Sequence, residues 1–377
     1  MELLKRIHLI AAARPNFMKI APLYHALKEQ SWANPEIVHT GQHYDSNMSD
    51  DFFRDLNLPK PDYHLEVGSG SHAQQTGQVM IAYEKLLFDK SPDLVIVVGD
   101  VNSTIAASLT AAKLGILVAH LEAGLRSNDR SMPEEINRIV TDHICNYLWT
   151  PSPDGDSNLL AEGIPQDRIE LVGNIMIDAL ELTRSRIESD KTVSKMNLSD
   201  NSFGIVTLHR PANVDIHKRL EDIVHILLRL SKHLCLVFPV HPRTEKQLKK
   251  FQLFERLKKS TNIILTPPLP YIQFMNLVFN SKIVITDSGG LQEETTYLGI
   301  PCLTLRPNTE RPITISQGTN QLSKIETLES DIHKALNTPI NSQIPDLWDG
   351  KTAYRVVEAI KKIKKSNYMY RKGKRHN

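Results

Sequence analysis

Cysteine and long apolar runs are scarce in this chain of 377 residues. The three cysteines (Cys145, Cys235 and Cys302) are far apart, without a CxxC pair or metal-ligand spacing, which argues against a disulfide framework and a thiolate metal site. Each lies beside apolar residues, as expected of buried thiols in a reducing compartment. No apolar run reaches the length of a membrane span. The first residues lead into an expected strand and not into a secretory signal, so we expect a cytoplasmic protein with no membrane partner.

The chain also lacks a large excess of positive or negative charge, because its formal net charge is only +2. Eight Lys and Arg without an acid follow residue 360, so the body of the chain is slightly acidic and the tail is basic. This distribution is not that of a nucleic-acid-binding protein, and we interpret the tail as a solvated helix end and a disordered terminus. The apolar share of 41% and the charged share of 23% are those of a soluble globular protein, and the length suffices for two domains.

What the chain does have is an alternation of short apolar runs and helical patterns, with charged residues where the runs end. Arg14 and Lys19 follow the first run, Asp100 follows the run 94–98, and Glu122 follows a run that ends at residue 119. This alternation predicts parallel sheets with helices on both faces, and ligands bind such sheets at the carboxyl ends of the strands. Arg14 and Lys19 suit an anion at a helix N-terminus, with an ordinary surface cation as the alternative. Asp100 is a candidate reactive carboxylate or, alternatively, a helix N-cap.

The segment 120–143, HLEAGLRSNDRSMPEEINRIVTDH, concentrates charge between two apolar segments. Glu122 and Glu134 are its candidate functional residues, because most structural loops do not need a segment with five carboxylates and three arginines. The alternative for Glu134 is purely structural: Ser131 and Glu134 have the spacing of a capping box, and Pro133 suits a first helical turn.

The alternation restarts in the second half of the chain. Residues 189–202 are polar and without a clear pattern, and we interpret them as a surface connection. The apolar run 203–208 then ends at His209, within the motif HRPAN. A lone histidine is more often structural than catalytic, but two basic residues at a strand end favour an anion contact.

A second phosphate signal follows the run 282–286, where Ser288, Gly289 and Gly290 precede a helix. Glycines let backbone N–H groups approach a diphosphate, and the helix dipole favours its charge. Glu294 lies one helical turn later and suits ribose hydroxyls, and Arg311 supplies a further cation. The alternative for the glycines is a tight turn with a good N-cap.

These motifs resemble one family, the bacterial and archaeal UDP-N-acetylglucosamine 2-epimerases of the non-hydrolysing type. The resemblance covers nearly the whole chain, and its most specific parts are AARP, GD, HLEAGLR, MPEEINR, TLHR, TDSGGLQEE and TERP. It implies an α/β fold of the GT-B-like kind, with two Rossmann-like doubly wound domains facing a central cleft. Residues 1–172 would carry the catalytic acids, residues 173–353 would bind UDP, and residues 354–377 would form a helix that crosses back to the first domain, followed by the basic tail.

The resemblance also implies roles for individual residues. The family's catalytic residues match Asp100, Glu122, Glu134 and His209. Its contacts to UDP and the sugar match Arg14, Lys19, Arg138, Phe274, Ser288, Gly289, Gly290, Glu294 and Arg311. A homodimer is implied as well. The chemistry requires neither a redox cofactor nor a metal, so we expect no cofactor.

Two segments depart from many bacterial members of this family. Those members have an arginine-bearing motif and a Gln-His-Arg sequence in an activator pocket, where this chain has residues 70–76 (GSHAQQT) and 42–45 (QHYD). We therefore expect no strong activation by substrate. The motif HRPAN stands in place of the commoner HRREN. The loops HTGQHYD and GSGSH also occur in relatives that act on a 2,3-diacetamido uronate sugar nucleotide.

The function expected from this resemblance is reversible C2 epimerisation of UDP-N-acetylglucosamine for cell-surface polysaccharide synthesis. A hydrolysing epimerase, which releases UDP and N-acetylmannosamine, and an epimerase of the diacetamido uronate are the first alternatives. A GT-B glycosyltransferase is a more distant one, because a transferase does not require the acids of this pattern. A non-enzymatic sugar-nucleotide sensor would have no use for reactive carboxylates.

Overall fold

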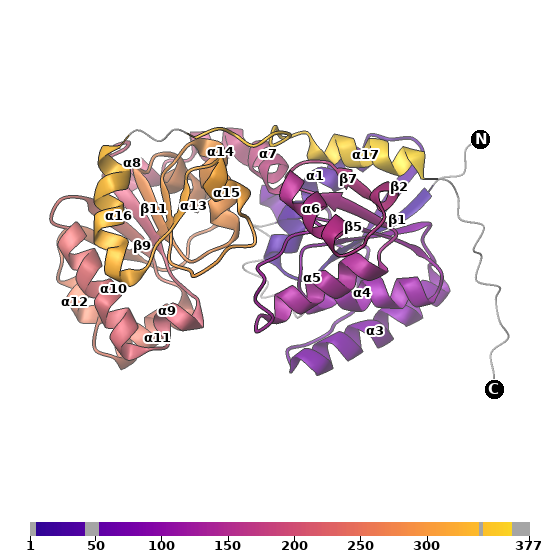
Figure 1. Ribbon diagram of the computed structural model, residues 1–377, viewed down its shortest axis with the longest axis horizontal. Coiled ribbons are helices and arrows are strands. Elements are labelled where there is room, and N and C mark those ends of the chain that lie inside the picture. Colours follow the sequence, from indigo (N-terminus) through magenta and orange to yellow (C-terminus); the bar gives the residue numbers. More distant parts are fainter. Residues whose placement is uncertain (1–4, 42–52, 339–341, 364–377) are drawn as a thin grey trace. The chain divides into compact units, whose positions relative to one another are not determined.

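The computed structural model describes residues 5–41, 53–338 and 342–363, and the chain divides into two compact units (Figure 1). Unit 1 comprises Met1–Leu182 and Asp346–Asn377, and unit 2 comprises Thr183–Pro345. The first boundary therefore lies within helix α7 (Ile175–Ser189), beyond residue 172, and the second lies before residue 354. The loop 42–45 and the basic tail from residue 364 lie outside the described residues.

Within the described residues, unit 1 contains a seven-stranded parallel sheet in the order β3-β2-β1-β4-β5-β6-β7. Its strands are β1 (Lys5–Ala11), β2 (Ala33–His39), β3 (Tyr63–His64), β4 (Leu94–Val98), β5 (Leu117–Leu121), β6 (Tyr147–Thr150) and β7 (Ile169–Leu171). Its further helices are α1 (Arg14–Lys28), α3 (His72–Asp89), α4 (Asn102–Lys113), α5 (Pro133–Ile144), α6 (Pro153–Ala161), a 3-10 turn (Gln166–Arg168) and α17 (Thr352–Lys362). In Figure 1, α1, α6 and α17 cover one face of the sheet, and α3, α4 and α5 cover the other. Because both faces are covered, central strands such as β4 are apolar throughout.

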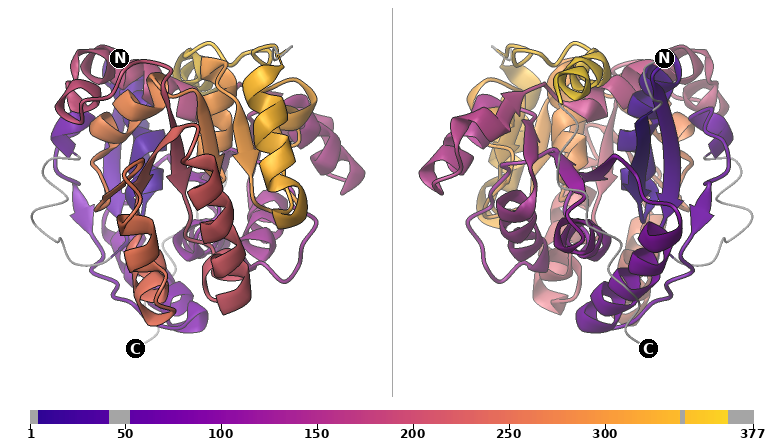
Figure 2. Two further views of the ribbon diagram at one scale, coloured as in Figure 1. Left: turned by 90° about the vertical axis from the view of Figure 1, so that its left-hand side faces the viewer. Right: turned by 90° about the vertical axis from the view of Figure 1, so that its right-hand side faces the viewer.

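Unit 2 repeats this architecture with a six-stranded parallel sheet, counted over the described residues, in the order β10-β9-β8-β11-β12-β13. Its strands are β8 (Phe203–Thr207), β9 (Cys235–Pro239), β10 (Ile263–Thr266), β11 (Ile283–Thr286), β12 (Cys302–Thr304) and β13 (Asn320–Leu322). Its helices are α8 (Thr192–Lys195), α9 (Pro211–Val214), α10 (His217–Leu230), α11 (Pro242–Lys250), α12 (Phe254–Lys258), α13 (Tyr271–Phe279), α14 (Gly290–Leu298), α15 (Ile313–Ser316) and α16 (Ile325–Asn337). Figure 2 shows helices flanking the strands from two further directions. The prediction of two doubly wound α/β units is confirmed.

The strand order reverses at one place in each sheet, between β1 and β4 in unit 1 and between β8 and β11 in unit 2. In doubly wound folds, ligands bind outside the carboxyl ends of the strands at such a reversal. Arg14 and Asp100 follow β1 and β4, and His209 and Ser288 follow β8 and β11. The expectation that the charged motifs lie at the carboxyl edges is therefore confirmed in both units.

The segment 189–202 is mostly exposed, as the interpretation as a surface connection implies, but it also includes one short helix. This helix is α8, in which Thr192 and Val193 are buried. Asn276 on α13 links α8 to the end of α7, because its Oδ1 accepts the N–H of Val193 at 3.1 Å and its Nδ2 donates to Ile187 O at 2.9 Å. Helix α8 is too short to show an apolar periodicity in the sequence, and a buried side-chain amide stabilises it instead.

The C-terminal helix α17 belongs to unit 1 and packs against α1. Asp178 caps its start by accepting the N–H groups of Thr352 at 3.1 Å and Ala353 at 2.7 Å. The indole N–H of Trp348 donates to Pro151 O at 3.0 Å just before this helix. These contacts fix the returning chain on unit 1. Over the described residues, no helix is both long and apolar enough to cross a lipid bilayer.

Candidate active site

Glu122 directly follows β5 and has an unusual backbone conformation. Its φ of +74° lies in the left-handed region, which is uncommon for residues other than glycine. Its N–H donates to Trp149 O at 3.0 Å, and its buried carboxylate forms an ion pair with the ammonium of Lys19 on α1. Such conformations persist where the surrounding contacts over-determine them, and they cluster at functional sites. Lys19 thus gives Glu122 a fixed counter-charge, a partner that the sequence did not indicate.

The turn after β4 passes directly over this ion pair. Gly99 has a φ of +70°, and a Cβ placed there would lie 3.3 Å from Lys19 Nζ and 3.6 Å from Glu122 Oε2. Asp100 follows, with its Oδ2 at 2.5 Å from Nη1 of Arg138. The N-cap of α4 is Val101, so the alternative of Asp100 as a helix cap is wrong. The structure therefore brings Asp100, Glu122, Lys19 and Arg138 to one edge of the sheet.

Arg138 on α5 is a buried cation with fixed orientation. Its Nη2 and Nε lie 2.5 and 3.1 Å from Oε2 of Glu135, whose carboxylate also accepts the N–H groups of Ser127 at 3.0 Å and Asn128 at 2.8 Å. Although burial opposes it, these backbone hydrogen bonds and the Arg138 guanidinium hold the pKa of Glu135 below its usual value. Glu135 thus anchors Arg138 so that Nη1 points at Asp100.

Glu134 has surroundings quite unlike those of the other two acids. Helix α5 begins at Pro133, its N-cap is Met132, and the hydroxyl of Ser131 donates to Asp129 Oδ1 at 2.6 Å. The capping box with Ser131 is therefore absent, and that structural alternative is wrong. Glu134 is exposed and makes no hydrogen bond or ion pair with other described residues. Its carboxylate is available to a ligand without breaking an internal contact.

Arg14 is the first residue of α1 and is exposed at the helix N-terminus. The start of this helix is fixed to the sheet by Asn16, whose Oδ1 accepts the N–H of Ala13 and whose Nδ2 donates to Val98 O, both at 3.0 Å. Arg14 is thereby held near the carboxyl ends of β1 and β4. An exposed guanidinium beside a helix N-terminus suits an anionic ligand.

In unit 2, His209 is held by Asp287, a residue that the sequence analysis did not select. Asp287 follows β11 and is fully buried, and its Oδ1 lies 2.9 Å from His209 Nδ1. The same carboxylate accepts the N–H of His209 at 3.1 Å, the N–H of Arg210 at 2.9 Å and Nδ2 of Asn213 at 3.1 Å. Burial opposes ionisation, but the hydrogen bond and charge of His209 hold the pKa of Asp287 below its usual value. Its position at a strand end, directly before the SGG turn, is the signal that could have revealed it.

The Ser288-Gly289-Gly290 turn packs against a row of buried charges. A Cβ on Gly289 would lie 2.8 Å from Glu310 Oε1 and 3.0 Å from Arg311 Nη1. Arg311 pairs with Glu310 and, through Nε at 2.9 Å, with Glu293, while Arg306 pairs with Glu310 at 2.7 Å. Despite burial, these two arginines hold the pKa of Glu310 well below its usual value. Arg306 and Glu310 were missed because only the tertiary contacts distinguish them from other charged residues in the loop.

Glu294 and Phe274 lie on neighbouring helices of unit 2. The carboxylate of Glu294 is buried on α14 and accepts the hydroxyl of Tyr271 at 2.8 Å. Phe274 is half-buried, one turn after Tyr271 on α13. Gly290 begins α14, and a Cβ there would meet no described atom within 4 Å. The helix N-terminus is therefore open to an anion, with a carboxylate one turn further along.

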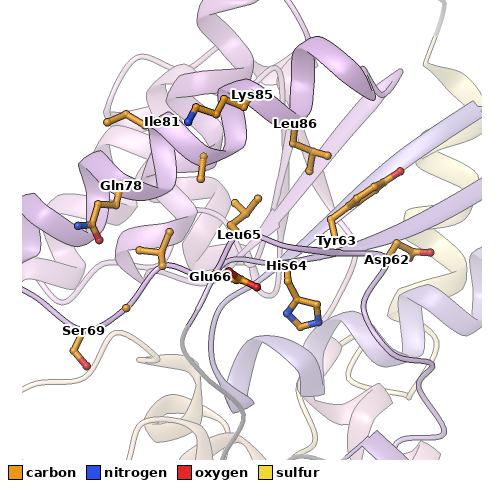
Figure 3. Close-up of a pocket in the computed structure, with 13 residues that line it drawn as sticks. Asp62, Tyr63, His64, Leu65, Glu66, Ser69, Gln78, Ile81, Lys85 and Leu86 are labelled. Carbon is orange, nitrogen blue, oxygen red and sulfur yellow. The ribbon is translucent and has the colours of Figure 1, made fainter.

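A pocket of about 850 Å³ lies elsewhere on unit 1, between α3 and the segment around β3. Figure 3 shows Gln78, Ile81 and Lys85 projecting from α3 on one side, with Tyr63 and His64 on the other. None of the candidate catalytic residues lines it. Among the described residues, no group of three or more His, Cys, Asp or Glu side chains is arranged to hold a metal ion.

Comparison with known proteins agrees with this arrangement. The family model described as UDP-N-acetylglucosamine 2-epimerase matches residues 25–361. The chain belongs to the UDP-N-acetylglucosamine 2-epimerase family. It is 42% identical over 362 residues to the UDP-N-acetylglucosamine 2-epimerase of Methanocaldococcus jannaschii, covering 94% of this chain and 98% of that protein. The structure of that epimerase in complex with UDP-GlcNAc and UDP matches with a TM-score of 0.86, over 94% of this chain and 99% of the other.

Two further matches show how far the similarity extends. The UDP-2,3-diacetamido-2,3-dideoxy-D-glucuronate 2-epimerase of Pseudomonas aeruginosa is 36% identical, over 95% of this chain and 100% of that protein. A lipopolysaccharide outer core galactosyltransferase matches with a TM-score of 0.53 at 15% identity, covering 94% of this chain and 99% of the other, which shows a shared fold alone. The fold of this epimerase-family chain is thus GT-B-like, as the sequence resemblance implied.

Proposed function

We propose that this protein interconverts UDP-N-acetylglucosamine and UDP-N-acetylmannosamine by eliminating UDP and adding it back. The observation that carries the proposal is the placement of Asp100, Glu122 and Glu134 in three different environments within unit 1. Asp100 is paired with Arg138, Glu122 is paired with Lys19, and Glu134 is exposed and unpaired among the described residues. Carboxylates with different partners can serve as base and acid in one reaction.

Elimination is required because the C2 proton of the substrate is not next to a carbonyl group. The C2–H bond breaks, its electron pair forms the C1=C2 double bond of a 2-acetamidoglucal, and UDP leaves C1 with the electrons of the C–O bond. UDP then adds back to C1 on the face from which it left, while a proton adds to C2 on the face opposite to the one it left, and this gives the C2 epimer. The carboxylates of unit 1 would take and return the proton.

The leaving diphosphate needs groups that stabilise developing negative charge. Arg14 in unit 1, together with His209, Arg311 and the N–H groups of the SGG turn in unit 2, would supply them. Asp287 supports this role of His209, because a carboxylate that accepts from Nδ1 leaves Nε2 as the nitrogen that can act on the substrate. Glu294 would hydrogen-bond the ribose hydroxyls, and Phe274 would be a further contact to the substrate.

An NMR time course with UDP-GlcNAc in D₂O tests this proposal. We expect UDP-ManNAc with deuterium at C2, and deuterium entering the recovered UDP-GlcNAc. Release of free UDP with N-acetylmannosamine would move the protein to the hydrolysing class. The absence of both product and exchange would refute the proposed substrate.

A second candidate substrate is the UDP-2,3-diacetamido uronate, favoured by the full-length match to the P. aeruginosa enzyme. It presents the same C2 proton and the same leaving group, so the same residues would serve. A competition experiment with both nucleotides measures the ratio of their kcat/KM values. We expect UDP-GlcNAc to be preferred, and a larger kcat/KM for the uronate would transfer the proposal to that substrate.

We also propose that the protein is a cytoplasmic homodimer that supplies polysaccharide synthesis. The three cysteines are free thiols, which suits a reducing compartment, and the homodimer is what the family resemblance implies. Light scattering coupled to size-exclusion chromatography tests the dimer, and a monomer across micromolar concentrations would refute it. Cell fractionation tests the compartment.

A further inference from the structure

His120 on β5 is fully buried, and each of its ring nitrogens faces an oxygen. Nδ1 lies 2.6 Å from Oδ1 of Asp142, and Nε2 lies 2.9 Å from the carbonyl oxygen of Gly99. A neutral imidazole has one donor and one acceptor nitrogen, whereas both of these oxygens only accept. The two contacts are satisfied together only when both ring nitrogens carry a proton.

The surrounding charges compensate a buried imidazolium. Asp142 is also fully buried and lies 2.7 Å from Nη1 of Arg126, and Arg126 in turn contacts Glu162 at 2.7 and 2.8 Å. With His120 protonated, this cluster contains two cations and two anions. Although burial alone would raise it, the charges of His120 and Arg126 hold the pKa of Asp142 below its usual value. Buried charges persist when they are paired and hydrogen-bonded in this way.

This cluster contacts the two turns that carry Asp100 and Glu122, two of the three proposed catalytic acids of unit 1. The carbonyl group of Gly99 belongs to the peptide bond that leads into Asp100. On the other side, Oδ2 of Asp142 accepts the N–H of Gly124 at 3.1 Å, two residues after Glu122. Gly124 has a φ of +80°, so this turn, like that of Gly99, requires a conformation that a side chain would strain. We propose that a protonated His120, paired with Asp142, positions Asp100 and Glu122 by fixing both turns.

The same sheet contains a second fully buried histidine, which serves as an internal control. His8 on β1 has Nδ1 at 3.1 Å from the hydroxyl of Tyr83, a group that can donate as well as accept. Burial, with a smaller contribution from Arg6, lowers the pKa of His8 to about 3, so this histidine is neutral. Nε2 of His8 lies 3.4 Å from Oε2 of Glu36 on β2, and none of its contacts with described residues involves a turn that carries a proposed catalytic acid. The structure thus predicts opposite protonation states for two buried histidines.

The protonation state can be measured directly on the full chain labelled with ¹⁵N-histidine. We expect both ring nitrogens of His120 to show imidazolium chemical shifts at pH 7 to 8, and His8 to show one protonated and one unprotonated nitrogen. The H120Q and H8Q variants assign the two signals, and D142N, which keeps the ring, assigns His120 if H120Q does not fold. A neutral tautomer at His120 would overturn the inference.

Positioning is tested by kinetics, and this part rests on the proposed epimerase function. We expect H120Q to lower kcat and the rate of C2 deuterium exchange by about 10- to 100-fold while KM changes by less than about twofold, since misplaced acids affect the chemical step. H8Q is expected to keep the kcat of the unmodified protein. Equal losses of kcat in H8Q and H120Q, or full activity in H120Q, would overturn the role of His120. If the unmodified protein epimerises neither nucleotide, the proposed function fails, whereas the ring shifts still decide the charge of His120.

Discussion

Asp287 and His209 form a contact of 2.9 Å between Oδ1 and Nδ1, which determines the nitrogen that His209 presents to a ligand. Asp287 is fully buried, whereas the His209 side chain is 42% exposed. The buried carboxylate therefore holds one side of the ring, and Nε2 is on the side that remains for substrate. The arrangement resembles the Asp–His pair of Ser-His-Asp hydrolases, in which the carboxylate accepts from Nδ1 and orients the imidazole ring.

The first prediction concerns D287N. An amide in place of the carboxylate removes the negative partner of Nδ1 and favours other ring orientations, so we expect kcat to fall by roughly 100-fold or more. Steady-state kinetics with UDP-GlcNAc measures it. D215N is the matched control, because Asp215 is also in unit 2 and pairs with Arg243 at the exposed surface. A kcat for D287N within a factor of about two of D215N would contradict the role of Asp287.

The second prediction separates chemistry from stability at Glu134. Because Glu134 is exposed and makes no hydrogen bond or ion pair with the described residues, E134Q should change the free energy of unfolding by less than about 0.5 kcal/mol. Its kcat should nevertheless fall by about 10²- to 10⁴-fold if the carboxylate transfers a proton. E326Q is the control, since Glu326 is exposed at the second position of α16, as Glu134 is in α5. Equal kcat values in the two variants would remove Glu134 from the mechanism.

The third prediction concerns E122Q, which should alter both activity and stability. The substitution leaves the ammonium of Lys19 without its charged partner in a buried site, so we expect unfolding to become easier by about 1–3 kcal/mol. C2 deuterium exchange should fall by about 10²- to 10⁴-fold. UDP binding, measured by calorimetry, should stay within about threefold, because the diphosphate contacts proposed for unit 2 are unchanged. Unchanged exchange in a folded E122Q protein would refute its catalytic role.

The fourth prediction compares the adjacent glycines of the SGG turn. A methyl group at Gly289 would lie 2.8 Å from Glu310 Oε1, so G289A must displace the buried charges and should lower both the melting temperature and the affinity for UDP. A methyl group at Gly290 meets no described atom within 4 Å, so G290A should keep the melting temperature and weaken only UDP binding. We expect a loss of about 10-fold or more in UDP affinity for both. Unchanged UDP affinity in both variants would place the diphosphate elsewhere.

The fifth prediction concerns acid stability and follows from His8. The unfolded chain binds a proton at this residue near pH 6.5, whereas burial delays protonation of the folded chain to about pH 3. The native state therefore loses stability as the pH falls below 6.5, by about 3 kcal/mol at pH 4. Thermal melts from pH 7 to 4 measure this loss, and H8Q should show a smaller decline. An identical acid dependence in H8Q would show that other groups cause the loss.

The sequence was sufficient to predict the two α/β units and the position of the charged motifs along them. Apolar, β-branched runs such as 94–98 have no polar face, so they fit only strands covered on both sides. Because parallel strands all end at the same edge, Asp100, Glu122 and His209 could be placed at sheet edges without coordinates. The phosphate-binding character of the SGG turn could also be predicted from the sequence, because it depends only on the glycines and on the start of the helix that follows them.

Contacts between distant residues were decided by the tertiary structure alone. Local pattern left Glu134 as a helix cap or a reactive acid, and the actual N-cap, Met132, removed the first alternative. Nothing in the sequence joined Asp287 to His209, or Lys19 to Glu122, because such pairs depend on strand order and on how each helix packs against its sheet. The sequence by itself thus determined which residues lie at the edges of the sheets, through the periodicity of apolar side chains. Only the tertiary structure determined which charges pair there, because those pairs form across elements whose adjacency no local pattern encodes.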